Sequence, residues 1–143
     1  MIFLLDVNLL FILHQPRHAD YEVVSKWLRR EKNMRFATCA MTQAGMMRLL
    51  VQDLPGFSRF SFEEARAAMQ QLVKRPGHVY WTEAPAYLEI TAEFLERLQG
   101  HRQITDAYLL GLARHHGGKL ATLDKGIKSI AGPHLEAFVE LVA

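Results

Sequence analysis

Short apolar runs alternate with longer amphipathic segments along this chain of 143 residues, and this alternation limits the possible fold more than any other feature. The first five residues, Met1–Leu5, are all apolar, as expected of a parallel strand that is buried on both faces. The segment 20–32 instead carries apolar residues at the spacing of an amphipathic helix. Strands separated by helices predict a three-layer α/β/α fold with a central, mainly parallel sheet of four to five strands.

The same patterns predict the order of the remaining elements. Further strands are expected at 35–39, 79–81, 119–123 and 137–141. Helices are expected at 8–14, 20–32, 42–51, 61–73, 85–98, 105–116 and 125–130. The expected N-caps are Asp20, Thr42 and Ser61, and the Gly117-Gly118 pair is expected to end a helix. Two successive helices after Thr42 predict a helical insert or hairpin over one side of the sheet.

Length and composition predict one globular domain over residues 1–143. Half of the residues are hydrophobic and 22% are charged, which is typical of a folded domain. The single Cys39 excludes an internal disulfide framework and a cysteine-based zinc cluster. No basic leader precedes the apolar start, and no run approaches the roughly 18 apolar residues of a membrane span. We therefore expect a cytoplasmic protein without membrane contact.

Three aspartates occur at chemically informative places. Asp6 follows the first apolar run, Asp106 opens the segment TDAYLLGLARHHGG, and Asp124 follows the run KLATL. In an open parallel sheet, residues that follow strands gather at one edge, beyond the carboxyl ends of the strands. Three carboxylates meeting there would repel one another unless a cation lay between them, and their hard oxygen atoms suit Mg²⁺ or Mn²⁺.

Each aspartate also has a purely structural interpretation. Asp6 is a candidate N-cap, Asp106 is a first-turn acid that favours the helix dipole, and Asp124 lies in a turn-forming LDKG sequence. Their joint placement at one sheet edge favours a metal site. Such a site would hydrolyse phosphodiesters: it would hold one or two divalent ions, would have Asp6 as the shared ligand and would need no nucleophilic side chain.

The charge distribution is compatible with a phosphodiester substrate. The net charge is +2, and setting the three aspartates aside leaves 17 basic and 12 acidic residues. Candidate contacts to an RNA backbone are Arg48, Lys125 and Lys128, the last two lying close to Asp124 in the sequence. Solvated lysine and arginine side chains on helix surfaces remain the alternative interpretation.

Over nearly its full length the chain resembles the PIN-domain ribonucleases, and among them the VapC-type toxins of bacterial toxin–antitoxin pairs. The resemblance begins at FLLDVNLL, where Asp6 fits the first family acid and Asn8 the accompanying polar residue. It continues through TQAGMMRLL and is strongest in TDAYLLGLARHHGGKLATLDKGI, where Thr122 and Asp124 form a Thr-x-Asp element. It implies a PIN-like fold, dependence on Mg²⁺ or Mn²⁺, endonucleolytic cleavage of RNA, a VapB-like antitoxin partner and a homodimer.

The chain departs from this family at one position. The resemblance implies a fourth acid on the helix after the second strand, yet no carboxylate occurs between Glu31 and Asp53. Thr42 and Gln43 occupy this region, and Gln43 offers a carbonyl oxygen or a partner for a metal-bound water but no charge. Arg48 is expected to bind phosphate or to restrain an acidic ligand through its planar guanidinium group. A solvent-facing Gln43 and a surface Arg48 are the alternatives.

Two other functions remain compatible with the sequence. The missing acid fits a catalytically weakened PIN domain that binds RNA or protein without cutting. Asp6 alone also fits a phosphatase or a phosphate-binding switch. Motifs for serine hydrolases, nucleoside triphosphates, dinucleotides and histidine-based zinc sites are absent from the sequence.

Overall fold

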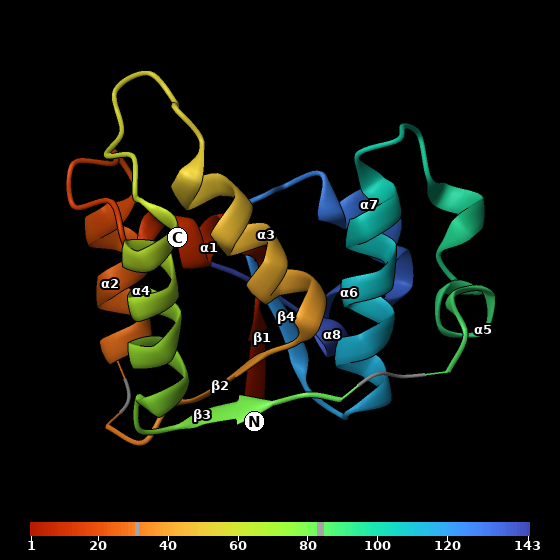
Figure 1. Cartoon of the computed structure of the whole chain (residues 1–143). Coiled ribbons are helices and arrows are strands. Elements are labelled where there is room, and N and C mark those ends of the chain that lie inside the picture. Colours follow the sequence, from red (N-terminus) through yellow and green to blue (C-terminus); the bar gives the residue numbers. More distant parts are fainter. Residues whose placement is uncertain (31, 83–84) are drawn as a thin grey trace.

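The computed structural model describes residues 1–30, 32–82 and 85–143, apart from the side chain of residue 135 (Figure 1). The strands are β1 (Ile2–Leu5), β2 (Arg35–Thr38), β3 (His78–Tyr80), β4 (Lys119–Thr122) and β5 (Val139–Leu141). The α-helices are α1 (Val7–Ile12), α2 (Tyr21–Arg29), α3 (Ala40–Val51), α4 (Phe62–Lys74), α5 (Tyr87–Thr91), α6 (Gln103–His115), α7 (Ile127–Ala131) and α8 (Leu135–Phe138). Two short 3₁₀ turns are η1 (Leu95–Arg97) and η2 (Gly132–His134).

The strands form one five-stranded sheet in the order β3-β2-β1-β4-β5, and all neighbouring strands are parallel. The first strand of the chain therefore lies at the centre, with β2 on one side and β4 on the other. Leu4 is paired with Ala37 of β2 and with Leu120 of β4. The expected fold class, with helices on both sides of a parallel sheet of four to five strands, is confirmed.

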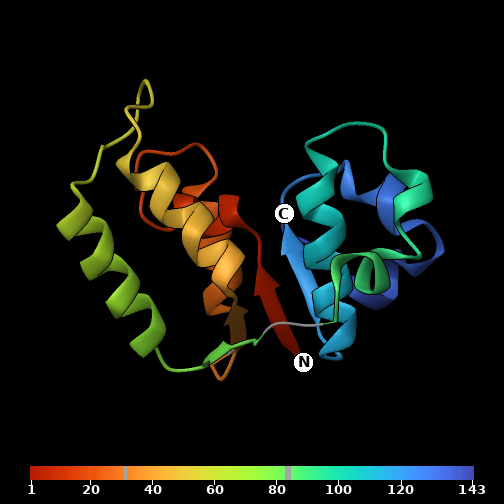
Figure 2. The same ribbon diagram turned by 45° about the vertical axis from the view of Figure 1, so that its right-hand side comes forward.

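The helices cover the two faces of the sheet in two separate groups (Figures 1 and 2). The first core lies between the sheet and α1, α2, α3 and α4, and includes Phe3, Leu10 and Met46. The second core lies between the other face and the later helices, and includes Leu4 and Leu110. Side chains of adjacent β1 residues enter opposite cores because successive strand residues point to opposite faces. The uniform apolar run of β1 thus follows from burial on both sides.

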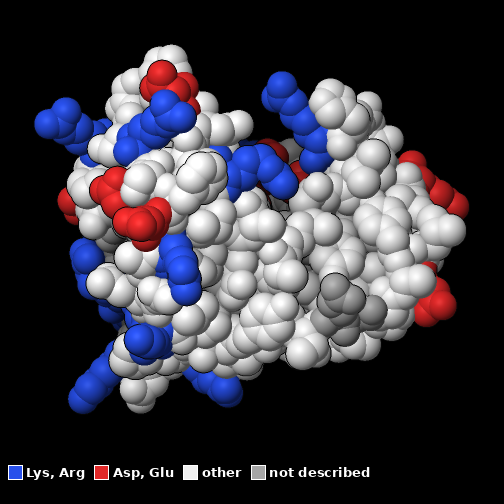
Figure 3. Space-filling view, viewed as in Figure 1, with Lys and Arg blue, Asp and Glu red and all other residues white. Residues whose placement is uncertain are grey.

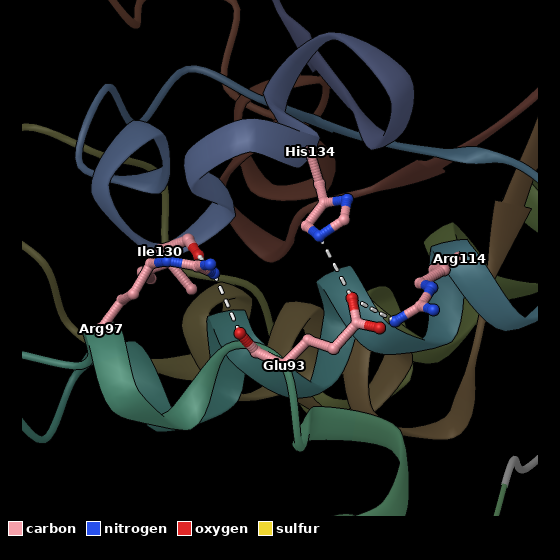
Figure 4. Close-up of polar contacts among 5 residues, drawn as sticks. All are labelled: Glu93, Arg97, Arg114, Ile130 and His134. Atoms are coloured by element: carbon pink, nitrogen blue, oxygen red, sulfur yellow. Dashed lines mark hydrogen bonds and ion pairs between the residues drawn. The ribbon is translucent and has the colours of Figure 1, made fainter.

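Polar contacts hold the segment after α5 against the C-terminal helices (Figure 4). The Glu93 carboxylate accepts a hydrogen bond at 2.5 Å from Arg114 Nη1 of α6 and lies 3.2 Å from His134 Nε2. Arg97 Nη1 donates to the carbonyl oxygens of Glu93 and Ile130, at 2.9 and 3.2 Å. These contacts join α6, α7 and the segment 93–97 into one layer on the second core.

Several local predictions are confirmed by hydrogen bonds. Ser61 caps α4, and its hydroxyl and the Glu64 side chain exchange 3.0 Å bonds with each other's backbone N–H groups. Gly117 ends α6 with a φ of 69°, a left-handed conformation that glycine adopts without strain. The Gly118 N–H then donates to the Ala113 carbonyl at 2.9 Å, and β4 follows directly.

Two local predictions were wrong, and a third is confirmed only for the position of the residue. The expected helix at 85–98 is two short pieces, α5 and η1, instead of one continuous helix. Thr42 is not the cap of α3: the helix begins at Ala40, Cys39 is the N-cap, and the Thr42 hydroxyl contacts the Cys39 backbone from inside the first turn. Asp20 is the N-cap residue of α2, as expected, but its side chain makes no capping hydrogen bond. No helix among the described residues is long and apolar enough to cross a bilayer.

Candidate active site

Asp6 lies at the carboxyl end of the central strand. Its backbone N–H donates to the Ala121 carbonyl at 3.0 Å, which keeps it in the ladder with β4. The residue is only 8% exposed, and Thr122 Oγ1 donates to its Oδ2 atom at 2.8 Å. Burial raises the pKa of the Asp6 carboxyl above its ordinary value, although the Thr122 hydroxyl and the Val7 N–H oppose the shift. The protein therefore holds this carboxylate in an environment that disfavours its charge.

Asp124 lies two residues beyond β4 in an exposed turn. Its Oδ1 atom accepts a hydrogen bond from the Gly126 N–H at 2.8 Å, and its own N–H donates to Thr122 Oγ1 at 3.0 Å. The Thr122 hydroxyl thus connects Asp6 and Asp124 directly. The turn interpretation of Asp124 is confirmed by these two hydrogen bonds, and the second carboxylate oxygen, Oδ2, takes no part in them.

Asp106 reaches the same edge from the other side of the sheet. It lies in the first turn of α6 and is partly exposed. Its pKa is raised to about 6, first by burial and then by the negative charges of Asp6 and Asp124. Helix α6 begins at Gln103, two residues before the expected Thr105, and Asp106 is still in its first turn. The negative charges of Asp6 and Asp124 act on it there.

These charges indicate a place for a cation. Acidic atoms lie at the bottom of a hollow between the two helical groups, and basic side chains stand on both sides of it (Figure 3). Over the described ranges, no three Asp, Glu, His or Cys side chains are gathered closely enough to form a ready-made metal cage. The donor chemistry still fits a divalent ion, since carboxylate oxygens are hard ligands and the charges of Asp6 and Asp124 raise the pKa of Asp106 beyond the effect of its burial.

The residues expected to contact the substrate are exposed. Asn8 of α1 is exposed and lines a cavity of about 380 Å³ together with Asp124. Arg48 is exposed in the last turn of α3, and Lys125 and Lys128 are exposed after Asp124. Each cation is thus accessible to an RNA backbone, which is the condition that the interpretation as phosphate contacts requires.

Gln43 lies on α3, the helix where the resemblance implies a fourth acid, and makes a contact that the sequence did not reveal. Its Nε2 atom donates to Thr38 Oγ1 at 3.0 Å, and Thr38 Oγ1 lies 2.7 Å from His78 Nε2. Because the Thr38 oxygen accepts from Gln43, its hydrogen is available to His78, whose pKa is lowered by burial. We call Gln43, Thr38 and His78 the neutral chain. Sequence reasoning missed Thr38 and His78 because no motif links residues 40 positions apart.

Gly45 explains how α3 approaches the site. A Cβ atom placed on Gly45 would lie 2.7 Å from Cγ2 of Val7, the residue that follows Asp6. The absence of a side chain therefore allows α3 to pack closely against the start of α1. A larger residue at this position would push apart the two elements that carry Arg48 and Asp6.

Comparisons with known proteins give matches over most of the chain. Residues 3–133 match the model of the PIN domain family. Ribonuclease VapC29 of Mycobacterium tuberculosis is 36% identical over 132 residues, which cover 92% of this chain and 92% of that protein. Ribonuclease VapC44 of the same organism is 34% identical over 131 residues, with 91% of each chain covered.

Solved structures show the same fold at lower identity. The sarcin–ricin loop cleaving toxin VapC20 of M. tuberculosis superposes with a TM-score of 0.68 at 18% identity, covering 100% of both chains. A chain of VapBC2 from Rickettsia felis, bound to a DNA fragment from its promoter, gives a TM-score of 0.66 at 15% identity, again with 100% of both chains covered. At such identities the similarity concerns the fold alone.

Proposed function

This chain belongs to the PIN-domain family, within the VapC ribonucleases, and on that premise we propose that it is a Mg²⁺- or Mn²⁺-dependent endoribonuclease, the toxin of a VapBC-type pair. The observation that carries the proposal is the 36% identity to Ribonuclease VapC29 over 92% of both chains. The placement of the three aspartates supports it, since burial and then the negative charges of Asp6 and Asp124 raise the pKa of Asp106. Three acidic side chains that repel one another at an accessible sheet edge are suited to a divalent cation. Residues 1–143 form one PIN domain in this proposal.

Asp6, Asp106 and Asp124 are the proposed metal ligands and catalytic residues. Asp6 is the fixed ligand, since its backbone belongs to the central sheet and Thr122 orients its carboxylate. Asp106 and Asp124 come from a helix and a turn and complete the set. When bound, a divalent ion polarises a phosphoryl oxygen and lowers the pKa of a water molecule. Hydrolysis would form a bond from the oxygen of water to phosphorus and break the bond to the leaving ribose oxygen, which would take up the proton that water loses.

The remaining residues position the substrate or the ligands. Arg48, Lys125 and Lys128 attract the RNA backbone towards an otherwise acidic edge. Asn8 lies beside Asp124 in one cavity, where its amide can donate to a phosphate oxygen. Thr42 and Gln43 act indirectly by fixing the start of α3. The cations attract the RNA backbone, and a bound divalent ion would neutralise the carboxylates that otherwise repel it.

Partners follow from the family as well. The neighbours named VapBC and FitAB pair a toxin with an antitoxin, and some are bound to DNA. We extend this to a cognate VapB-like antitoxin that blocks the acidic edge, to a homodimer and to action on cytoplasmic RNA.

The test is cleavage of a structured RNA by the purified protein in Mn²⁺ or Mg²⁺, beside Asp106→Asn protein purified in parallel. We expect cleavage by the native protein, suppression by a chelator, and a loss of at least about 100-fold in the variant, since several kcal/mol of charge stabilisation are removed. Equal cleavage by both proteins would point to a contaminating nuclease and remove the assignment.

A catalytically weakened PIN domain is the second candidate, because Gln43 replaces an acid and is engaged with Thr38. It predicts RNA binding without cleavage by the native protein in the same experiment. The phosphatase alternative predicts release of phosphate from small phosphoesters, which a nuclease with an open site for a polymer would not catalyse.

A further inference from the structure

The turn that carries Asp124 continues directly into α7, a helix of only 5 residues. The Ile127 N–H donates to the Asp124 carbonyl oxygen at 3.2 Å, and the Gly126 N–H donates to the Asp124 carboxylate at 2.8 Å. A helix this short is not stable by itself, because its few internal hydrogen bonds do not offset the cost of ordering the chain. Contacts with the rest of the protein therefore set the position of α7 and of Asp124.

Apolar side chains fix one face of α7. Ile127, Ile130 and Ala131 are buried in the second core. The hydrophobic effect holds these side chains away from water but has no preferred direction. A hydrogen bond depends on both distance and angle, so it restricts sliding of a helix along its neighbour more tightly than burial does.

The Arg97 side chain provides such a directional contact at the carboxyl end of α7 (Figure 4). Its Nη1 atom donates to the Ile130 carbonyl oxygen at 3.2 Å and to the Glu93 carbonyl oxygen at 2.9 Å. Carbonyl groups in the last turn of a helix have no partner within the helix, and a donor from another segment satisfies them. Arg97 thus joins η1 to the end of α7.

Gly132 leaves room for the Arg97 guanidinium group. It follows α7 with a φ of 54°, a conformation that glycine adopts without strain. A Cβ atom placed on Gly132 would lie 2.8 Å from Arg97 Nε and 3.0 Å from Cζ. Any other residue would therefore strain the backbone and displace the guanidinium group from Ile130.

Glu93 connects the same segment to α6, the helix that carries Asp106. Its carboxylate pairs with Arg114 in the last turn of α6 and lies 3.2 Å from His134 Nε2, just beyond α7 (Figure 4). A regular helix of 13 residues moves as one body, so fixing its last turn restricts Asp106 in its first turn. We call Glu93 and Arg97 the brace, because together they hold α6 and α7 to one segment.

We propose that the brace sets the separation of Asp106 and Asp124, and that Glu93 and Arg97 are thereby positioning residues for the divalent cation. The inference rests on the proposed function and adds two residues that are not metal ligands themselves. Mg²⁺ accepts oxygen ligands only near roughly 2.1 Å, so small shifts of a ligand weaken its binding. Within the described ranges the acids form no ready-made cage, and the brace limits how far the ion must draw Asp124 towards Asp106.

The experiment removes the brace and leaves the acids unchanged. Arg97→Met removes both donated hydrogen bonds and retains a long, flexible side chain. The matched control is Arg59→Met: Arg59 Nε donates at 3.1 Å to the carbonyl oxygen of Val51, the last residue of α3, in the other helical group. Glu93→Ala removes the acceptor for Arg114, and Glu93→Gln keeps one. Circular dichroism and thermal melting verify that each variant is folded.

Isothermal titration measures the affinity for Mn²⁺. Arg97→Met and Glu93→Ala should weaken binding by about fivefold, since residues that orient metal ligands directly contribute about 10-fold or more and the brace acts one step further away. Glu93→Gln should remain within about twofold of the native affinity, because an acceptor for Arg114 is retained. Arg59→Met should match the native protein. Native affinity in Arg97→Met, or equal weakening by Arg59→Met, would overturn the inference.

Amide hydrogen exchange of the metal-free protein gives a second readout that needs no activity. Arg97→Met should speed exchange of the Gly126 and Ile127 N–H groups by about 10-fold, because the turn opens locally more often. The Val142 N–H, which donates to Thr122 in the sheet, should exchange as in the native protein. Unchanged exchange at Gly126 and Ile127 would show that Arg97 does not hold the turn.

Two outcomes separate this inference from the proposed function. If the native protein cuts RNA and Arg97→Met binds Mn²⁺ as tightly as it does, the brace is not a positioning device, although the ribonuclease assignment stands. If the native protein binds Mn²⁺ but cuts no RNA, the ribonuclease assignment fails. A fivefold weaker affinity of Arg97→Met for Mn²⁺ would then still support the brace.

Discussion

Thr38 and Thr122 occupy equivalent places in the molecule but maintain opposite kinds of polar network. Thr38 is the last residue of β2 and Thr122 the last residue of β4, and both strands pair with β1. Both threonines are almost completely buried. Thr38 joins an amide and an imidazole in the neutral chain, whose members satisfy one another. Thr122 joins two carboxylate-bearing residues, Asp6 and Asp124, in an environment that disfavours negative charge. One strand end is complete by itself, and the other is the proposed place of a cation.

The largest difference between the two ends is expected in catalysis. Asp6→Asn removes the proposed fixed ligand and should lower RNA cleavage by at least about 100-fold, because several kcal/mol of charge stabilisation depend on it. The measurement is the initial rate of cleavage of a fixed oligoribonucleotide at saturating Mn²⁺. A rate within a few-fold of the native value would show that the acidic end is not the reacting site.

The two threonines themselves provide the next test. Thr122→Val removes a donor to Asp6 and an acceptor for the Asp124 N–H, so it should weaken Mn²⁺ binding by about 10-fold. Thr38→Val disrupts the neutral chain and should leave Mn²⁺ binding unchanged. Both variants should lose about 1–3 kcal/mol in free energy of unfolding, because buried polar partners lose their hydrogen bonds.

Isothermal titration with Mn²⁺ and urea denaturation measure the two quantities. Thr122→Ser, which retains the hydroxyl, should restore most of the metal affinity. If both valine variants weakened Mn²⁺ binding equally, the distinction between the two strand ends would be lost.

The pH dependence of stability tests the charge on the acidic end. Folding raises the pKa of Asp106 from 3.8 to about 6, so the native state binds this proton more tightly than the unfolded chain does. The resulting stabilisation is fully present below pH 3.8 and is lost as the pH rises through about 6. Solvent screening of this partly exposed group limits the effect to about 1–2 kcal/mol.

Asp106→Asn should therefore be more stable than the metal-free native protein at pH 7, and the difference should diminish towards pH 4. Urea denaturation of both proteins in a chelator at several pH values measures it. A native protein that is the more stable of the two at pH 7 without metal would contradict the proposed repulsion.

The smallest effect is expected at Gln43. Gln43→Ala removes one hydrogen bond to Thr38 and should cost about 1 kcal/mol in stability, with cleavage changed by less than about threefold. Cleavage rates and thermal melting measured together decide the matter. A loss as large as that of Asp6→Asn would instead assign Gln43 to the metal site.

The general arrangement followed from periodicity and from residue types at strand ends. The apolar run 1–5 and the helical stripe of 20–32 predict a buried central strand and a covering helix. An all-apolar strand is buried on both faces, and a helix with one apolar stripe is buried along that stripe alone. The Ser61 cap and the Gly117 stop were predicted for the same local reason. By contrast, the segment 85–98 has helical composition but forms α5 and η1, and its Glu93 and Arg97 make long-range contacts with Arg114, His134 and Ile130 that no local pattern contains.

The sequence by itself determined that this chain is a parallel α/β protein with acids after β1 and β4 and at the start of α6, since local patterns set both. Only the tertiary structure decided which groups meet. It connected Thr122 to Asp6 across 116 positions and turned Gln43 towards Thr38 and His78. The physical reason is that strand register and helix packing choose neighbours from distant parts of the chain, and no local pattern contains that choice.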